Sequence, residues 1–212
     1  MRSILTVTAA ATVTKLTTLE RLKLELKIGN NDNDAILKAK IDEASSDISA
    51  ALGFMVQRET VSETFWFENG DTAPEYLLLD RVPVASIASV TVDGLAVDAA
   101  QYRVDDQTGQ LYRLDASGYP CHWYFCKDIV VAYTGGFLLP GEAGRNLPFG
   151  IEGGCIDLVT GYWMSRGRDP LVKSEDIPGV MSTEYWVGSV GESGELPPNV
   201  MSKIAPYRRA VA

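Results

Sequence analysis

The sequence predicts an α+β protein in which a small helical bundle carries an inserted antiparallel β-sheet or sandwich. Apolar residues recur at three- and four-residue spacing towards both ends of the chain. In the middle the period changes to two, and Asp-Gly and Gly-Gly pairs punctuate the strand-like runs. We therefore expect an N-terminal arm and helical hairpin over 1–55 and a β domain over 56–135. Residues 136–212 should supply a third helix, a polar loop and a C-terminal helix that completes the bundle.

The two N-terminal helices have recognisable starts and stops. Thr17, with Glu20 three residues later, fits a capping box, and Ile28-Gly29 should end this short helix. Asp34 should cap a longer amphipathic helix, which Gly53 ends in the left-handed conformation. The apolar faces of the two helices should meet in an antiparallel hairpin.

The β domain should contain about six strands, since runs of β-branched and aromatic residues alternate with turn signals. The expected strands are Glu59–Phe67, Tyr76–Leu79, Ile87–Val92, Gln101–Val104, Gln110–Leu114 and Trp123–Tyr133. Asp93-Gly94 predicts a tight hairpin, because a primed turn needs positive φ at both central positions. The threonine-rich segment 1–11 is expected to form an extended arm or a first strand instead of a signal peptide.

The C-terminal part should return to helix. A third helix is expected over 148–166, opened by proline, and its paired Gly153 and Gly154 predict close packing against another helix. A polar loop is expected over 167–194, followed by a last helix from Pro197.

Composition limits the classes of function. The chain has 212 residues, is 46% hydrophobic and has a net charge of −9, so its surface as a whole should repel nucleic acid and anionic membranes. Residues 29–80 hold eleven acids against three bases, whereas residues 197–212 hold three bases and no acid. This asymmetry suits a protein with two different partners. Three cysteines, an odd number, favour a reducing compartment.

The residues offer little to support catalysis. Cys121, His122 and Cys126 are close in sequence, but a structural zinc site needs four ligands and only Cys155 could complete the set. Packed thiols are favoured over zinc or a Cys121–Cys126 disulfide, although a metal-dependent enzyme remains an alternative. No nucleophile elbow, phosphate loop or dinucleotide fingerprint is present in the sequence. We therefore expect no catalytic residue, no metal and no cofactor.

The aromatic residues leave a second alternative open. Trp66, Trp123 and Tyr124 could form a binding platform for a ligand such as a carbohydrate on an exposed sheet face. Core packing is the favoured interpretation, and burial of these side chains would argue against the platform.

Several motifs occur in a characteristic order. They are Thr18-Leu19-Glu20, the acidic turn 31–34, the segments 79–87 and 90–94, Tyr102–Asp105, Gly109–Leu111, Val130–Phe137 and Ala205–Arg208. In this order and spacing, from about Thr17 to Arg209, the chain resembles the head-to-tail connector proteins of long-tailed bacteriophages, also called adaptor or head-completion proteins.

The resemblance implies a structural virion protein and not an enzyme. Such proteins form a dodecameric ring beneath the portal protein, extend the DNA channel and offer a docking platform to a stopper, tail-terminator or other tail protein. The implied partners are these proteins and neighbouring copies of the chain. DNA would pass through the lumen without sequence-specific binding, and no membrane is involved. The implied location is the head-tail interface of the virion, and the host cytoplasm during assembly.

Two candidate contact sites follow from the resemblance and the charge pattern. A basic, apolar tail is expected to dock on the portal through Ile204, Pro206, Tyr207, Arg208 and Arg209. The polar loop is expected to contact the tail or a neighbouring copy through Glu175, Asp176, Tyr185 and Trp186.

Overall fold

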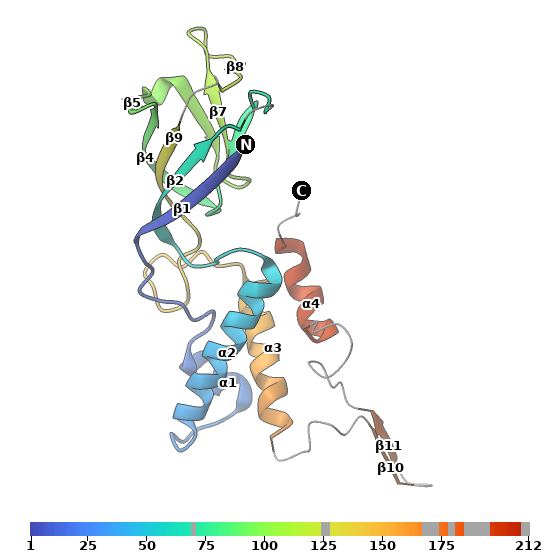
Figure 1. Ribbon diagram of the computed structural model, residues 1–212. Coiled ribbons are helices and arrows are strands. Elements are labelled where there is room, and N and C mark those ends of the chain that lie inside the picture. Colours follow the sequence, from blue (N-terminus) through green and yellow to red (C-terminus); the bar gives the residue numbers. More distant parts are fainter. Residues whose placement is uncertain (69–70, 124–127, 167–173, 178–180, 185–195, 209–212) are drawn as a thin grey trace. The chain divides into compact units, whose positions relative to one another are not determined.

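The computed structural model describes residues 1–68, 71–123, 128–166, 174–177, 181–184 and 196–208. The chain divides into two compact units (Figure 1). The first, here called the β unit, consists of Met1–Val13 and Met55–Leu138. The second, the helical unit, consists of Thr14–Phe54 and Leu139–Ala212. The predicted α+β class is confirmed, because the described residues form four helices, two packed antiparallel sheets and a separate two-stranded sheet.

One sheet of the β unit has five antiparallel strands. In spatial order they are β1 (Arg2–Ala9), β2 (Glu59–Trp66), β9 (Ile129–Gly135), β4 (Val84–Val92) and β5 (Leu95–Ala96). The N-terminal segment is the edge strand of this sheet, which confirms the expected first strand. Figure 1 shows β1 lying along β2.

The second sheet contains β3 (Tyr76–Leu78), β7 (Gln110–Leu114) and β6 (Tyr102–Asp105), in that order. The short β8 (Pro120–Cys121) also pairs with β7, and a 3₁₀ turn, η1 (Ala99–Gln101), precedes β6. Both sheets contribute alternate residues to one apolar core, so the β unit is a sandwich. The core residues include Val61 and Phe65 from β2, Leu77 from β3 and Leu111 from β7.

Most of the predicted strands are present, but the last of them begins later in the sequence than predicted. Trp123 was expected to begin the last strand, but β9 begins at Ile129. The Trp123 amide instead donates to the Pro74 carbonyl oxygen at 2.9 Å, and its side chain is buried in the core. The predicted hairpin is confirmed, because Asp93 has φ 50° and Gly94 has φ 79° between β4 and β5.

The helical unit contains α1 (Leu19–Leu26), α2 (Asp34–Leu52), α3 (Phe149–Met164) and α4 (Pro198–Ile204), which continues as a 3₁₀ turn, η3 (Ala205–Tyr207). The helix α3 packs on α2 on one side and on α4 on the other (Figure 1). The predicted apolar face of α2 is buried, from Leu37 through Ile41 and Ile48 to Leu52. Among the described residues, no helix has the length and apolar character needed to span a membrane.

Both ends of α1 differ by one position from those predicted. Thr18, not Thr17, caps α1, since its hydroxyl accepts the Arg21 amide at 3.2 Å. The Thr17 hydroxyl is buried and donates to Glu152 at 3.4 Å, so it is used in packing α1 against α3. The helix ends at Lys27, whose φ of 56° places it in the left-handed region before the expected Ile28-Gly29 stop.

Asp34 is the first residue of α2 and not its cap. Asn33 occupies the cap position, but its side chain does not cap the helix and instead accepts a hydrogen bond from Arg166 at 3.3 Å. The Asp34 carboxylate instead accepts Lys23 Nζ at 2.8 Å, which ties the start of α2 to α1. Gly53 ends the helix in the left-handed conformation, as predicted.

The expected polar loop over 167–194 is not entirely loop. The strands β10 (Ser174–Ile177) and β11 (Met181–Glu184) pair antiparallel within it. A short polar strand pair has no period-two apolar signal, so sequence patterning missed it.

Candidate functional site

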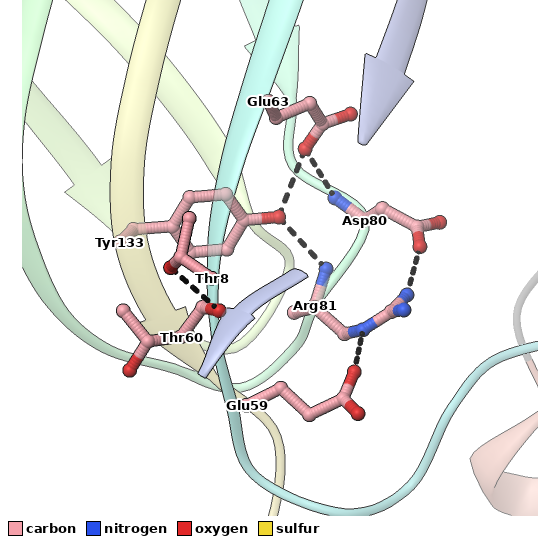
Figure 2. Close-up of polar contacts among 7 residues, drawn as sticks. All are labelled: Thr8, Glu59, Thr60, Glu63, Asp80, Arg81 and Tyr133. Atoms are coloured by element: carbon pink, nitrogen blue, oxygen red, sulfur yellow. Dashed lines mark hydrogen bonds and ion pairs between the residues drawn. The ribbon is translucent and has the colours of Figure 1, made fainter. Parts of the chain in front are cut away.

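A polar cluster of mostly buried side chains lies in the β unit (Figure 2). Glu63 on β2 accepts the Tyr133 hydroxyl at 2.8 Å and the Asp80 amide at 3.1 Å. The same hydroxyl accepts the Arg81 amide at 3.0 Å, and Arg81 Nε pairs with Glu59 at 3.0 Å. A second nitrogen of Arg81 pairs with Asp80. The cluster therefore joins β2, β9 and the segment after β3.

Burial alters the proton affinities of this cluster. Removal from water raises the pKa of Glu63 above its ordinary value, against the opposing effect of its hydrogen bonds to Asp80 and Tyr133. Burial, reinforced by the Glu63 charge, raises the pKa of Tyr133 well above its usual range. The hydroxyl of Tyr133 is therefore protonated at all ordinary pH values and serves as a permanent donor to Glu63.

The backbone around the cluster is packed too closely for larger residues. A Cβ atom at Gly135 would overlap the Arg81 carbonyl oxygen, and one at Gly136 would overlap the Gln57 carbonyl oxygen. Gly136 also has φ 101°, which side chains rarely tolerate. Because its polar groups bond to one another and to the backbone, we interpret the cluster as a structural lock on residues 80–83.

Sequence patterning missed this cluster, although a signal was present. Glu59 and Glu63 alternate in step with the apolar Val61 and Phe65 of β2, so their side chains must point into the core. An inward-facing carboxylate requires a partner. The partner residue could not be identified without the fold.

The C-terminal segment is seated on α3. The Ile204 side chain is fully buried, and a Cβ at Gly154 would lie 3.0 Å from its Cγ2 atom. The Tyr207 ring lies over Gly150, where an added Cβ would come 2.8 Å from Cε2. Lys203 pairs with Asp157 at 2.5 Å. The glycines of α3 thus admit α4, which confirms the predicted close packing at Gly154, whereas Gly153 meets only the Lys203 side chain at ordinary distance.

The structure places the expected portal-docking residues in different environments. Ile204 is an internal anchor of the helical unit, while Pro206 and Arg208 are exposed. Tyr207 is exposed over 37% of its surface although its ring rests on α3. Arg209 lies outside the described residues.

The second expected contact site is described only in part. Glu175 and Asp176 lie in β10, opposite Thr183 and Ser182 of β11. Tyr185 and Trp186 lie outside the described residues.

Among the described residues, the cysteines do not belong to a cluster that could bind a metal ion. No group of three or more potential ligands occurs there. Cys121 and Cys155 carry free thiols, and Cys126 lies outside the described residues. Cys155 is buried beside Ser45, and burial raises the pKa of its thiol to about 12, so it is a packed thiol.

The aromatic platform expected of a carbohydrate-binding module is not formed by Trp123. This side chain is fully buried, and its Nε1 donates to the Leu111 carbonyl oxygen at 3.1 Å. Trp66 is half-buried on the outer face of β2, and Tyr124 lies outside the described residues. A ligand therefore cannot stack on Trp123, which argues against this alternative.

Comparison with known proteins gives a family and a fold. Residues 16–79, which include α1, α2, β2 and β3, match the family described as phage gp6-like head-tail connector protein. Among curated proteins, none matches the chain.

Several solved structures share the fold over nearly the whole chain. A chain in the neck of an empty gene transfer agent particle, computed with C6 symmetry, aligns with a TM-score of 0.58 and 17% identity. A chain in the neck of the native particle, computed with C12 symmetry, aligns with a TM-score of 0.58 and 15% identity. A chain in the virion of the native particle aligns with a TM-score of 0.56 and 15% identity. Each alignment covers 99% of this chain and 97% of the other.

The family match agrees with the resemblance found in the sequence and with the expectation of a structural protein instead of an enzyme. Residues 16–79 are thus similar to the phage gp6-like head-tail connector family, and the chain as a whole shares the fold of the gene transfer agent neck chains.

Proposed function

We propose that the protein is the adaptor ring of a virion neck, located between the portal vertex and the tail. The observation that carries this proposal is the connector family match over residues 16–79. The shared fold with gene transfer agent neck chains, over almost the full length of both proteins, supports it. The ring would be dodecameric, would extend the DNA channel, and would present a platform to a stopper or tail-terminator protein.

The portal contact is assigned to the segment after α4. Arg208 is exposed and follows directly on the 3₁₀ turn, and a guanidinium can bind a carboxylate of the portal through two parallel hydrogen bonds. Tyr207 adds an aromatic contact that loses little conformational entropy, because its ring already rests on Gly150. Ile204 fixes the direction of the segment from inside the helical unit.

The lumen of the ring is expected to be negative. The chain has a net charge of −9, so an acidic inner wall would repel the phosphate backbone and let DNA slide without sticking. DNA would therefore be bound neither tightly nor in a sequence-specific way. The hairpin β10–β11, which includes Glu175 and Asp176, is assigned to contact with the tail or a neighbouring copy.

Portal binding tests the docking proposal. Purified portal rings are sedimented with the chain, and the bound fraction is measured against chain concentration. The double variant Tyr207→Ala/Arg208→Ala should weaken binding at least tenfold, which corresponds to about 1.4 kcal/mol or more. Lys38→Ala, which removes an exposed base from α2, is the matched control and should bind like the wild type. Equal binding by wild type and double variant would refute the docking assignment.

A further inference from the structure

The five-stranded sheet has an outer face without carboxylates. On β2, the inward-facing residues are buried, and the residues between them are half-buried and point away from the core. One row across the sheet runs through Thr6, Ser62, Ala132 and Ser89, which are paired in register. A parallel row includes Ile4, which pairs with Thr64 and is 60% exposed. We call this surface, formed by the outward residues of β1, β2, β9 and β4, the hydroxyl face.

The opposite side of the sandwich has a different character. On β3, Leu77 is buried in the core, while Tyr76 and Leu78 on either side of it are exposed. Tyr76 pairs in register with Tyr112 of β7, and the two rings lie 5.7 Å apart at 53°. We call the surface formed by Tyr76, Leu78 and Tyr112 the tyrosine face. Arg103 and Asp105 of β6 flank it with opposite charges.

Charge limits where two copies can meet. The β unit holds twelve Asp or Glu residues against six Lys or Arg, a net charge of −6. Contact between surfaces that carry this excess would place like charges together, which costs several kcal/mol. The hydroxyl face carries one charge, at its corner, where Arg2 pairs with Glu68 at 3.0 Å. The two faces are therefore surfaces on which copies can approach without like-charge repulsion.

We propose that the hydroxyl face of one copy packs against the tyrosine face of the next. The inference rests on the proposed ring and names the contact between its neighbours. Because the two faces lie on opposite sides of one sandwich, the contact is heterologous and repeats head to tail, as a cyclic ring requires. The aromatic rings can pack on the row of small residues Thr6, Ser62, Ala132 and Ser89, and the tyrosine hydroxyls can bond to the serine and threonine hydroxyls opposite.

The test places one arginine on each face. Thr64→Arg alters the hydroxyl face, Leu78→Arg alters the tyrosine face, and Ala116→Arg, in the exposed turn after β7, alters neither. All three variants add the same charge to a chain of net −9, so general repulsion between copies decreases equally. Melting curves of the free chains show that each variant is folded before assembly is scored.

Ring formation on purified portal is then counted by electron microscopy. Thr64→Arg and Leu78→Arg should each lower the yield of complete rings at least tenfold, and Ala116→Arg should leave it unchanged. Wild-type rings together with normal yields for either folded face variant would overturn the pairing and leave the connector role standing. Failure of the wild type itself to form rings on the portal would instead count against the proposed function.

Mixing the two face variants gives a second test of the proposed pairing. Thr64→Arg copies keep the tyrosine face and Leu78→Arg copies keep the hydroxyl face, so an equimolar mixture at high concentration should form pairs and stop there. Sedimentation velocity should detect these pairs in the mixture and none in either variant alone. Pairs formed by one variant alone would show a like-to-like contact and would contradict the heterologous interface.

Discussion

The Tyr133 hydroxyl donates a hydrogen bond of 2.8 Å to Glu63 in the interior of the β unit. Because this hydroxyl also accepts the Arg81 amide, a single atom connects a central strand of the five-stranded sheet to the segment that follows β3. Figure 2 shows the side chains that make this connection. The interior of the β unit therefore depends on a specific polar contact as well as on its apolar core.

Removing the hydroxyl should destabilise the β unit. Tyr133→Phe leaves the buried Glu63 carboxyl with one donor fewer and the Arg81 amide without its partner, which costs about 1–3 kcal/mol. Denaturant unfolding measures the loss. Tyr112→Phe is the control, because its hydroxyl bonds to Gln110 on the half-exposed outer face and its loss should cost less. Equal effects of the two substitutions would contradict the structural importance of the cluster.

The pH dependence of stability should show the effect of Glu63. Burial raises its folded pKa, so the folded protein keeps this proton at pH values where the unfolded chain has lost it. The resulting stability is complete below the unfolded pKa, about 4.3, and is lost as the pH rises through the folded pKa. Because glutamine resembles the protonated acid, Glu63→Gln should gain stability relative to wild type as the pH rises through this window.

The measurement is the free energy of unfolding of both proteins from pH 4 upward. Glu75→Gln, which removes an exposed carboxylate from the same unit, controls for the change in net charge. A difference between Glu63→Gln and wild type that stays constant with pH would show that burial does not perturb Glu63.

The glycines of α3 should respond differently to alanine. Gly161 has open space where a Cβ would lie, so Gly161→Ala should stabilise the helical unit by about 1 kcal/mol through helix propensity. At Gly154 the same methyl group would lie 3.0 Å from the fully buried Ile204, so crowding should offset this gain and cost about 1–3 kcal/mol. Thermal unfolding of both variants provides the comparison. Equal stabilisation would mean that α4 does not pack closely on α3.

The contact at Gly135 gives an independent test of the lock. Gly135→Ala would drive its methyl group into the Arg81 carbonyl oxygen, so the segment after β3 must move. We expect a loss of about 1–3 kcal/mol or more. Gly29→Ala, where the added atom meets nothing within 4 Å, is the control. Hydrogen exchange at the Asp80 and Arg81 amides should also quicken in Gly135→Ala, and unchanged protection would contradict the predicted displacement.

Periodicity and turn chemistry predicted much of the fold. The spacing of Leu37, Ile41 and Ile48 predicted a buried helix face, and Asp93-Gly94 predicted a hairpin, because both signals are local. Local sequence patterns could not show which of the adjacent residues Thr17 and Thr18 caps α1. Thr17 is instead required for a buried contact with Glu152, which is distant in sequence.

The candidate sites were harder to predict than the fold. The sequence indicated a docking tail. Only the fold shows that the Ile204 side chain is buried against α3, whereas Arg208 is exposed. Arg81 was part of a recognised motif, yet its buried partner Glu59 lies 22 positions earlier in the sequence, where no spacing rule connects the two. Long-range pairing of this kind is set by topology and not by local sequence.

The connector role itself is tested most directly by electron microscopy of the purified chain mixed with the portal protein of the same virus. The chain alone and the portal alone are the controls. The account predicts an additional ring, coaxial with the portal and of its symmetry, with the segment around Arg208 at the contact. A portal that stays bare at saturating concentrations of folded chain would contradict the account.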